Sequence, residues 1–76
     1  MRRPTLSTQF GQLLKKRREE LGLSQEALAS RARVHRTYVG LVERGLRNTS
    51  LDVASRLAEA VGRRLSEIVR EAETKA

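Results

Sequence analysis

The sequence predicts an all-α fold built from five short helices. Along most of the chain, apolar residues recur at spacings of three and four, which is the period of an amphipathic helix packed on a core. The alternation of apolar and polar residues that marks a half-buried strand is absent, and the aromatic residues are only Phe10 and Tyr38. Helix-ending glycines and helix-starting serines separate the apolar segments. No repeat or linker is visible, so residues 1–76 are expected to form a single domain.

The first two helices are predicted over residues 7–21 and 25–31. Gly22 follows the first helix at a position where a C-cap favours a positive φ angle. Ser24 is a good N-cap for the second helix, and Glu26 in its first turn is favoured by the helix dipole. The residues expected on the core-facing sides of these helices are Phe10, Leu14, Arg18, Leu21, Leu28 and Ala32.

Three more helices are predicted in the second half of the chain. The third ends at Gly45 and the fourth at Gly62, both of which suit a C-cap, while Ser50 is a good N-cap for the fourth. Residues 1–6 and 73–76, at the two ends of the chain, are expected to be frayed. The third helix begins at His35 or Arg36, and the fourth and fifth cover residues 51–61 and 65–71. The apolar residues of these helices are Val39, Val42, Leu51, Ala54, Leu57, Ala58, Val61, Leu65, Ile68 and Val69.

The positive charge of the chain is concentrated in its first two thirds. The net charge is +7, and residues 1–48 contain eleven Lys and Arg against four Glu, whereas residues 49–76 contain five charges of each sign. Most of the cations are Arg, whose planar fork donates two parallel hydrogen bonds to a phosphate or to a guanine edge. Basic side chains also serve solubility alone, so the charge favours nucleic-acid binding only if a reading element lies in the basic part.

Composition and motifs exclude several classes of protein. No cysteine is present, which removes disulfides, zinc fingers and thiol catalysis, and a single histidine leaves little to hold a transition metal. No apolar run approaches the length of a membrane span, and none follows the basic N-terminus, so no transmembrane helix or signal peptide is expected. His35 stands where an N-cap belongs, and no catalytic constellation accompanies it. We therefore predict a cytoplasmic, non-enzymatic protein without membrane contact, metal, cofactor or small-molecule ligand.

Residues 25–44 have the spacing of a helix-turn-helix, in which a short helix and a tight turn precede a second helix. Ala29 is small enough for two helices to approach closely, and Val39 and Val42 pack the second helix back on the first helix of the chain. The remaining apolar positions of the motif are Leu28, Ala32 and Val34. The motif is preceded by LGLSQ, which ends in its first residue, and is followed by GLRNTSL.

With both flanks in place, the chain resembles the Cro/CI-like (XRE) family of phage and bacterial transcriptional regulators over about residues 9–71. The resemblance implies a five-helix, lambda-repressor-like DNA-binding domain, with a double-stranded DNA operator as the partner. The segment HRTYV at 35–39, followed by ER at 43–44 and RN at 47–48, also resembles the small controller proteins of restriction–modification systems.

In this family the third helix lies in the major groove, so the resemblance implies that its outward residues read bases. Arg36 suits the O6 and N7 acceptors of guanine, and Thr37 either bonds a base edge or touches a thymine methyl group. Leu41 is either a contact to a thymine methyl group or an ordinary exposed leucine. Gly40 reflects either a close approach of the helix to DNA or plain tolerance of glycine.

Phosphate contacts are expected around the recognition helix. The N-terminus of the second helix presents backbone N–H groups that attract anions, and Arg44 and Arg47 follow the third helix, where they suit a clasp on one strand. Tyr38 either offers its hydroxyl group to a phosphate or is a half-buried core ring. Arg31 and Arg33, near the turn, are interpreted as solvated charges. The residues predicted to contact phosphates are Ser24, Gln25, Tyr38, Arg44, Arg47 and Asn48.

The resemblance also implies an ion pair between Arg18, on the apolar face of the first helix, and Glu43 in the third. Two departures from the family pattern concern the backbone. Arg33 stands where the family usually has a glycine, so either it adopts a left-handed conformation at a cost of about 1–2 kcal/mol or the turn differs. Residues 63–64 are arginines where the family often has an apolar residue and a serine cap. The fifth helix is therefore expected to start late, with Ser66 as its cap.

The predicted function is a sequence-specific transcriptional regulator that binds a roughly palindromic DNA operator as a homodimer, with two recognition helices about 34 Å apart. The resemblance to controller proteins implies autoregulation through protein concentration. One alternative is an antitoxin that binds a toxin protein as well as its own promoter, and another is a non-specific nucleic-acid-binding protein driven by charge. The dimer interface is expected to contain Leu65, Ile68 and Val69.

Overall fold

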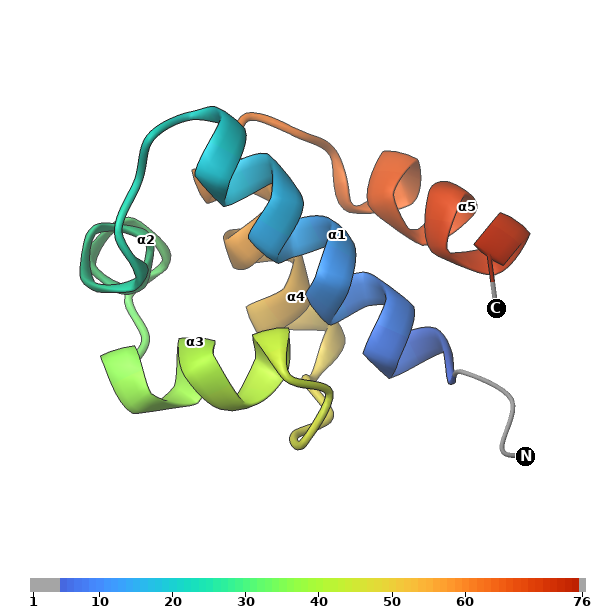
Figure 1. Cartoon of the computed structure of the whole chain (residues 1–76), viewed down its shortest axis with the longest axis horizontal. Coiled ribbons are helices and arrows are strands. Elements are labelled where there is room, and N and C mark those ends of the chain that lie inside the picture. The colour runs from blue at the N-terminus through green and yellow to red at the C-terminus, as the bar shows by residue number, and fades with distance from the viewer. Residues whose placement is uncertain (1–4, 76) are drawn as a thin grey trace.

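The structure of the chain, a computed structural model, describes residues 5–75 and contains five α-helices there (Figure 1). No strand occurs in this part of the chain, so the predicted all-α fold is confirmed. In Figure 1, α1 crosses the middle of the molecule, with α3 on one side of it and α5 on the other. The helices are α1 (Leu6–Glu20), α2 (Gln25–Ala32), α3 (Arg36–Glu43), α4 (Leu51–Ala60) and α5 (Leu65–Lys75).

Side-chain caps begin the helices that position the site. Ser24 and Ser50 each accept a hydrogen bond from the backbone N–H three residues further on, at 3.0 and 3.2 Å. His35 is the N-cap of α3, as predicted, because its Nδ1 accepts a hydrogen bond from the Thr37 N–H at 3.1 Å. Each cap satisfies one of the N–H groups that the first turn of a helix leaves without a backbone partner.

Both ends of the helical part extend further than the sequence predicted. Thr5 is the N-cap of α1, so the prediction that residues 1–6 are frayed is wrong at residues 5 and 6. The prediction of fraying over residues 73–76 is wrong for 73–75, because α5 continues to Lys75. The buried side chain of Ala72 and the packing of α5 along α1 stabilise this longer helix. The remaining residues of the two predicted segments, 1–4 and 76, lie outside the described residues.

The start of α5 also differs from the late start predicted at Ser66. α5 begins at Leu65, and the backbone N–H of Arg64 donates a hydrogen bond to Oε1 of Glu67 at 2.8 Å. This bond is one half of a capping box, in which a glutamate in the first turn satisfies the N–H of the residue before the helix. The carboxylate of Glu67 therefore satisfies the backbone N–H of Arg64, and α5 starts at Leu65 without a serine cap.

The apolar core lies between the helices, with α1 packed against α3 and α5, and α2 packed against α3 and α4. Ile68 is only 6% exposed and belongs to this core, which corrects its predicted place at a dimer interface. Leu21 and Leu51 were expected to face the core, but both are exposed, Leu51 to 79%. The buried apolar residues are Phe10, Leu13, Leu14, Leu28, Ala29, Ala32, Val39, Val42, Ala54, Leu57, Ala58, Val61, Ile68 and Ala72.

Gly11 brings α1 and α3 close together. A Cβ atom added at this position would overlap the carbonyl oxygen of Val42, at the end of α3. Glycine is therefore required here by the close approach of two backbones, which is one of the few roles that no other residue can fill. This contact sets how far α3 can project from the body of the molecule.

The turn between α2 and α3 is left-handed at Arg33, with φ 59° and ψ 46°. In residues 5–75 this is the single non-glycine residue with a positive φ angle. The N–H of Val34 donates to the carbonyl oxygen of Ala29 at 3.0 Å and that of Arg33 to Ser30 at 3.3 Å, which is the bonding of a Schellman motif. Of the two alternatives left by the sequence, Arg33 thus keeps the family's turn, at a cost of about 1–2 kcal/mol for its side chain.

Candidate nucleic-acid interface

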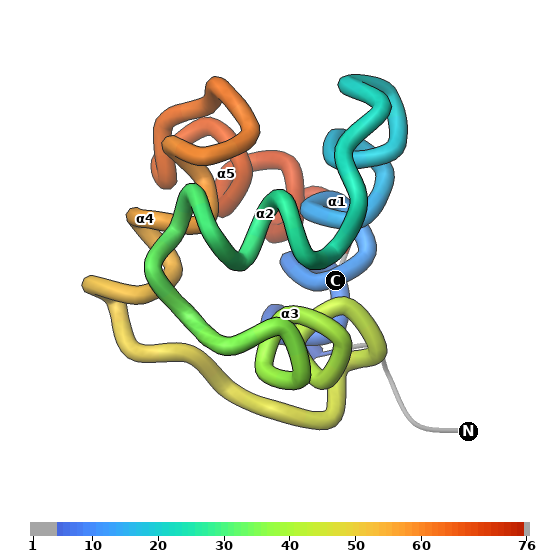
Figure 2. Tube along the Cα trace, turned by 90° about the vertical axis from the view of Figure 1, so that its left-hand side faces the viewer, coloured from blue at the N-terminus to red at the C-terminus, as the bar shows by residue number. Residues whose placement is uncertain are grey.

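α2 and α3 pack against each other and are joined by a short turn, as in a helix-turn-helix. Figure 1 views α2 along its axis with α3 lying across the picture, and Figure 2, turned by 90°, views α3 along its axis with α2 lying across. Val39 and Val42 hold α3 on the core and are almost completely buried. The opposite side of α3 therefore faces solvent over its whole length.

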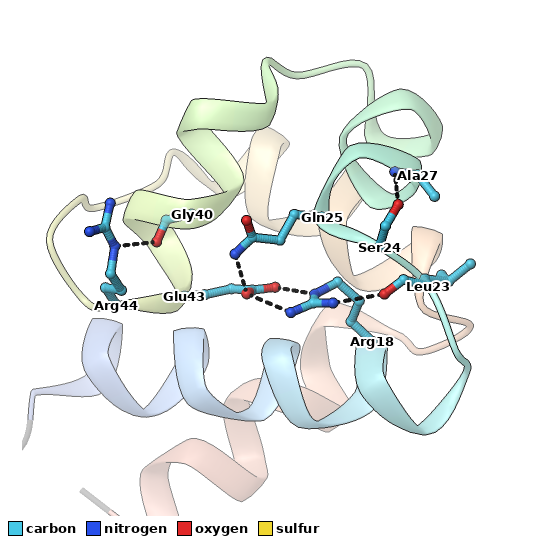
Figure 3. Close-up of polar contacts among 8 residues, drawn as sticks. All are labelled: Arg18, Leu23, Ser24, Gln25, Ala27, Gly40, Glu43 and Arg44. Carbon is cyan, nitrogen blue, oxygen red and sulfur yellow. Dashed lines mark hydrogen bonds and ion pairs between the residues drawn. The ribbon is translucent and has the colours of Figure 1, made fainter.

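A buried polar network fixes α1, α2 and α3 relative to one another (Figure 3). The expected ion pair of Arg18 and Glu43 is present: Nε of Arg18 lies 2.7 Å from Oε2 of Glu43, and Nη2 lies 3.0 Å from Oε1. Nη1 of Arg18 donates to the carbonyl oxygen of Leu23 at 2.7 Å, and Nε2 of Gln25 donates to Oε1 of Glu43 at 3.0 Å. The N-terminus of α2 and the C-terminus of α3 are thus joined through one carboxylate.

The two charged members of the network, Arg18 and Glu43, are buried but neutralise each other's charge. Arg18 is 8% exposed and Glu43 is 5% exposed. The hydrogen bonds that Arg18 donates to Glu43 raise the pKa of Arg18, against the lowering effect of burial. Within the described part of the chain, every buried side-chain nitrogen and oxygen has a hydrogen-bond partner. A buried charge pair of this kind is costly to break, because either partner alone would stay charged in an apolar setting.

The structure places the four predicted base-reading residues along the solvent side of α3. Arg36 and Thr37 are exposed in its first turn, and Gly40 and Leu41 are partly exposed one turn later. A Cβ atom at Gly40 would meet the amide of Gln25 at 3.8 Å, an ordinary contact distance, so packing within the chain does not require glycine there. Leu41 is half-buried, which makes it less exposed than the sequence suggested.

Ser24 and Gln25 stand at the N-terminus of α2, but their side chains already have partners in the chain. The Ser24 hydroxyl oxygen accepts the capping hydrogen bond from the Ala27 N–H, and the Gln25 amide donates to Glu43 (Figure 3). A phosphate group only accepts hydrogen bonds, so Gln25 can reach one through its second Nε2 hydrogen or through backbone N–H groups of the first turn.

Tyr38 and the segment after α3 form one surface. The Tyr38 ring is half-buried against the core, and its hydroxyl group donates to the carbonyl oxygen of Asn48 at 3.5 Å. The guanidinium carbon of Arg47 lies 5.4 Å from the centre of this ring, a cation–π contact. Arg44 donates from Nε to the carbonyl oxygen of Gly40 at 3.2 Å (Figure 3). Since Arg44, Arg47 and Asn48 are exposed, cationic and amide groups border the C-terminal end of α3.

The sequence did not reveal that several arginines tie helix ends together. One arginine donates to the carbonyl group that ends α2, and two donate to carbonyl groups at the end of α4, where positive charge is favoured by the helix dipole. Arg31, interpreted as a solvated charge, is one of them. The bonds join Arg56 Nε to Ala32 (2.9 Å), Arg17 Nε to Val61 (3.1 Å) and Arg31 Nη1 to Ala60 (3.5 Å). Their partners are backbone oxygens, which leave no signal in a sequence.

The sequence also did not reveal an ion pair next to the predicted base-reading residues. Nη1 of Arg36 lies 4.0 Å from Oε2 of Glu26, in the first turn of α2. The only available signal was the position of Glu26 directly after Gln25, which a helix-turn-helix brings close to the start of its second helix.

In residues 5–75, no helix is long and apolar enough to cross a membrane, and no three acidic or histidine side chains gather into a group that could hold a metal ion.

Comparison with known proteins agrees with this geometry. A family model described as helix-turn-helix matches residues 14–68. The control protein C.BamHI of Bacillus amyloliquefaciens is 43% identical over 54 residues, which are 70% of this chain and 67% of that protein. The solved structure of the restriction–modification controller protein C.AhdI from Aeromonas hydrophila is similar with a TM-score of 0.77 and 46% identity, covering 80% of this chain and 92% of that one. The clp gene regulator ClgR from C. glutamicum has a TM-score of 0.90 and 26% identity, covering 97% and 95%.

The fold and the solvent-facing third helix define the class of helix-turn-helix DNA-binding regulators. The chain belongs to the helix-turn-helix family, since the family model covers most of it and the curated relative is similar over two thirds of both chains. The resemblance to the Cro/CI-like (XRE) regulators is thereby confirmed.

Proposed function

We propose that the protein is a sequence-specific transcriptional regulator that binds a roughly palindromic operator as a homodimer, and that it controls a restriction–modification system. The observation that carries the proposal is the exposed first turn of α3, with Arg36 and Thr37, standing on a frame fixed by the Arg18–Glu43 pair. The similarity to proteins named as controllers of restriction–modification systems supports the biological setting. Such a regulator works beside the DNA, which for a bacterial controller is in the cytoplasm.

In this proposal, Arg36 donates to O6 and N7 of a guanine while Thr37 contacts a neighbouring base edge. Arg44, Arg47 and Asn48 contact the phosphates of the strand that passes the C-terminal end of α3. These contacts need no rearrangement of the core, because every one of these side chains is exposed. The Arg47–Tyr38 contact restricts the approach of that guanidinium group to one side of the ring.

The second copy of the chain would cover a shallow apolar hollow of about 140 Å³ beside α5. Leu65 and Val69 line this hollow together with Leu6 and Phe10. Leu6 is 44% exposed, and a large exposed apolar side chain at the rim of an apolar hollow is typical of an interface. Because Ile68 is buried, the proposed interface keeps Leu65 and Val69 and takes Leu6 in place of Ile68.

The test is a comparison of binding to specific and random DNA at a fixed salt concentration. Duplexes that bind the wild-type chain are enriched from a random library, and dissociation constants are measured for the wild type and Arg36→Ala. The variant should lose about 5- to 150-fold of the preference for one guanine over other bases at that position. This factor corresponds to the free energy of a bidentate contact, about 1–3 kcal/mol. Arg63→Ala, an equal change of charge at an exposed site before α5, should keep it. Equal affinity of the wild type for enriched and random duplexes would contradict the proposal.

Regulation by protein concentration, without a small-molecule ligand, follows from the controller proposal. Footprinting on the promoter upstream of the gene should reveal protection of paired half-sites about one helical turn apart, centre to centre. Sedimentation at increasing concentration should give twice the mass of the chain. A Leu65→Glu change should keep the chain monomeric and remove the paired footprint, and a monomer that still protects both half-sites equally would argue against the dimer.

A further inference from the structure

A carboxylate stands among the residues that face DNA in the proposed function. Oε2 of Glu26 lies 4.0 Å from Nη1 of Arg36, and the two side chains are 78% and 68% exposed. Together with Ser24 and Gln25 they line a shallow hollow between the first turns of α2 and α3. Near DNA, a negative side chain is repelled by the phosphates, so an exposed glutamate at this place weakens non-specific binding.

Local electrostatics favour this arrangement in the free protein. Glu26 lies in the first turn of α2, where the helix dipole stabilises a negative charge. Arg36 is the first residue of α3, where the same effect disfavours a positive charge. The carboxylate of Glu26 offsets that disadvantage and holds the guanidinium group of Arg36 on the side of α3 that faces α2.

The position of Glu26 is fixed by the polar network rather than by its own side chain. The preceding residue, Gln25, donates its amide to Glu43, and Glu43 is paired with the buried Arg18. The first turn of α2 therefore cannot shift along α3 without breaking the partly buried hydrogen bond between Gln25 and Glu43. The backbone turn that carries Glu26 is therefore held beside the first turn of α3, and a fixed backbone is a requirement for reading a base rather than for adding general charge.

We propose that Glu26 is a specificity-determining residue that accepts a hydrogen bond from N4 of a cytosine next to the guanine bound by Arg36. A carboxylate offers only acceptors, and in the major groove only cytosine N4 and adenine N6 are donors. Adenine presents its N7 acceptor beside N6, which repels the second carboxylate oxygen, whereas cytosine has no acceptor on that side. This inference rests on the proposed operator binding and adds a second reading residue to it.

The test compares two glutamate variants on single base-pair replacements. Duplexes enriched by the wild-type chain are changed one pair at a time, and dissociation constants are measured for the wild type, Glu26→Gln and Glu73→Gln at one salt concentration. Glu26→Gln should lose about fivefold or more of the discrimination at one C·G pair beside the guanine whose recognition Arg36→Ala removes. It should also bind random DNA more tightly. Glu73→Gln makes the same change of charge on exposed α5 and should match the wild type.

Three results would overturn the inference. Unchanged discrimination at every pair in Glu26→Gln would exclude a reading role. Tighter binding to all duplexes by the same factor would reduce Glu26 to a repelling charge. A wild-type chain that prefers no duplex at all would overturn the proposed function itself, and the reading role of Glu26 with it, which separates this failure from the other two. Circular dichroism should give equal helix content for the three chains, because both glutamates are exposed.

Discussion

The two helices that flank α1, α3 and α5, are held to the rest of the chain by different contacts. Around α2 and α3, the carboxylate of Glu43 bonds to both Arg18 and Gln25. The packing of α5 on α1 and α4 is instead built on buried apolar residues such as Ile68 and Ala72. Charged hydrogen bonds have a fixed direction, whereas apolar burial is roughly proportional to area and does not depend on direction. We infer that the polar network around Glu43 fixes the orientation of α3, while the burial of apolar side chains supplies the stability of the fold.

The largest expected loss of stability comes from breaking the ion pair between Arg18 and Glu43. In Glu43→Leu the guanidinium group of Arg18 stays buried without a counter-charge, so the free energy of unfolding should fall by about 3–5 kcal/mol. Urea unfolding followed by circular dichroism measures the loss. The double variant Arg18→Met with Glu43→Leu should lose less than the sum of the two single variants, and additive losses would contradict the coupling of the pair.

Shortening a buried apolar side chain should separate the effect on stability from the effect on the orientation of α3. Leu57 is completely buried in α4, and Leu57→Ala should lower the free energy of unfolding by about 3 kcal/mol through lost burial and the cavity left behind. Compared at a temperature where both variants are folded, Leu57→Ala should keep the wild-type preference for the enriched duplex over random DNA, whereas Glu43→Leu should lose part of it. Equal loss of preference in both variants would remove the distinction between the two regions.

The smallest expected effect has the opposite sign. Arg33→Gly removes the strain of a left-handed side chain but adds freedom to the unfolded chain, so it should raise the free energy of unfolding by about 0.5–1 kcal/mol. Arg31→Gly is the matched control, because it makes the same change of charge two residues earlier. Inside α2, that glycine should lower stability by about 1 kcal/mol or more, because the change also removes the hydrogen bond from Arg31 to Ala60. A destabilised Arg33→Gly would mean that the side chain of Arg33 makes a contact worth more than its strain.

The bounds of the first four helices were predictable to within one or two residues, because their signals are local. Ser24 and Ser50 cap helices through the backbone three residues away, and Gly22, Gly45 and Gly62 adopt positive φ angles just past helix ends. α5 was predicted less well. Its first turn uses Glu67 instead of a serine, and its length depends on the burial of Ala72 in the core, which is a contact between distant parts of the chain.

In the candidate site, too, the features that depend on neighbouring residues were predictable and those that depend on contacts between helices were not. That Arg36 and Thr37 would be exposed on the recognition helix follows from helical periodicity, once Val39 and Val42 are assigned to the core. The pairing of Arg36 with Glu26 does not follow, because it depends on the crossing of two helices. The exposure of Leu51 and the burial of Ile68 were likewise misjudged, since periodicity selects a face but not how much of that face another helix covers.

By itself, the sequence determined the fold class, the location of the helix-turn-helix and the concentration of charge in residues 1–48, because caps, periodicity and composition are properties of neighbouring residues. Only the tertiary structure decided what each arginine does. Arg18 is buried against Glu43, and Arg36 faces solvent beside Glu26. Arg56, in α4, donates a hydrogen bond to the carbonyl oxygen of Ala32 at the end of α2. The same type of side chain is buried and structural in one place and exposed in another. Its partners are carboxylates and backbone oxygens from other helices, which come together only when the helices pack.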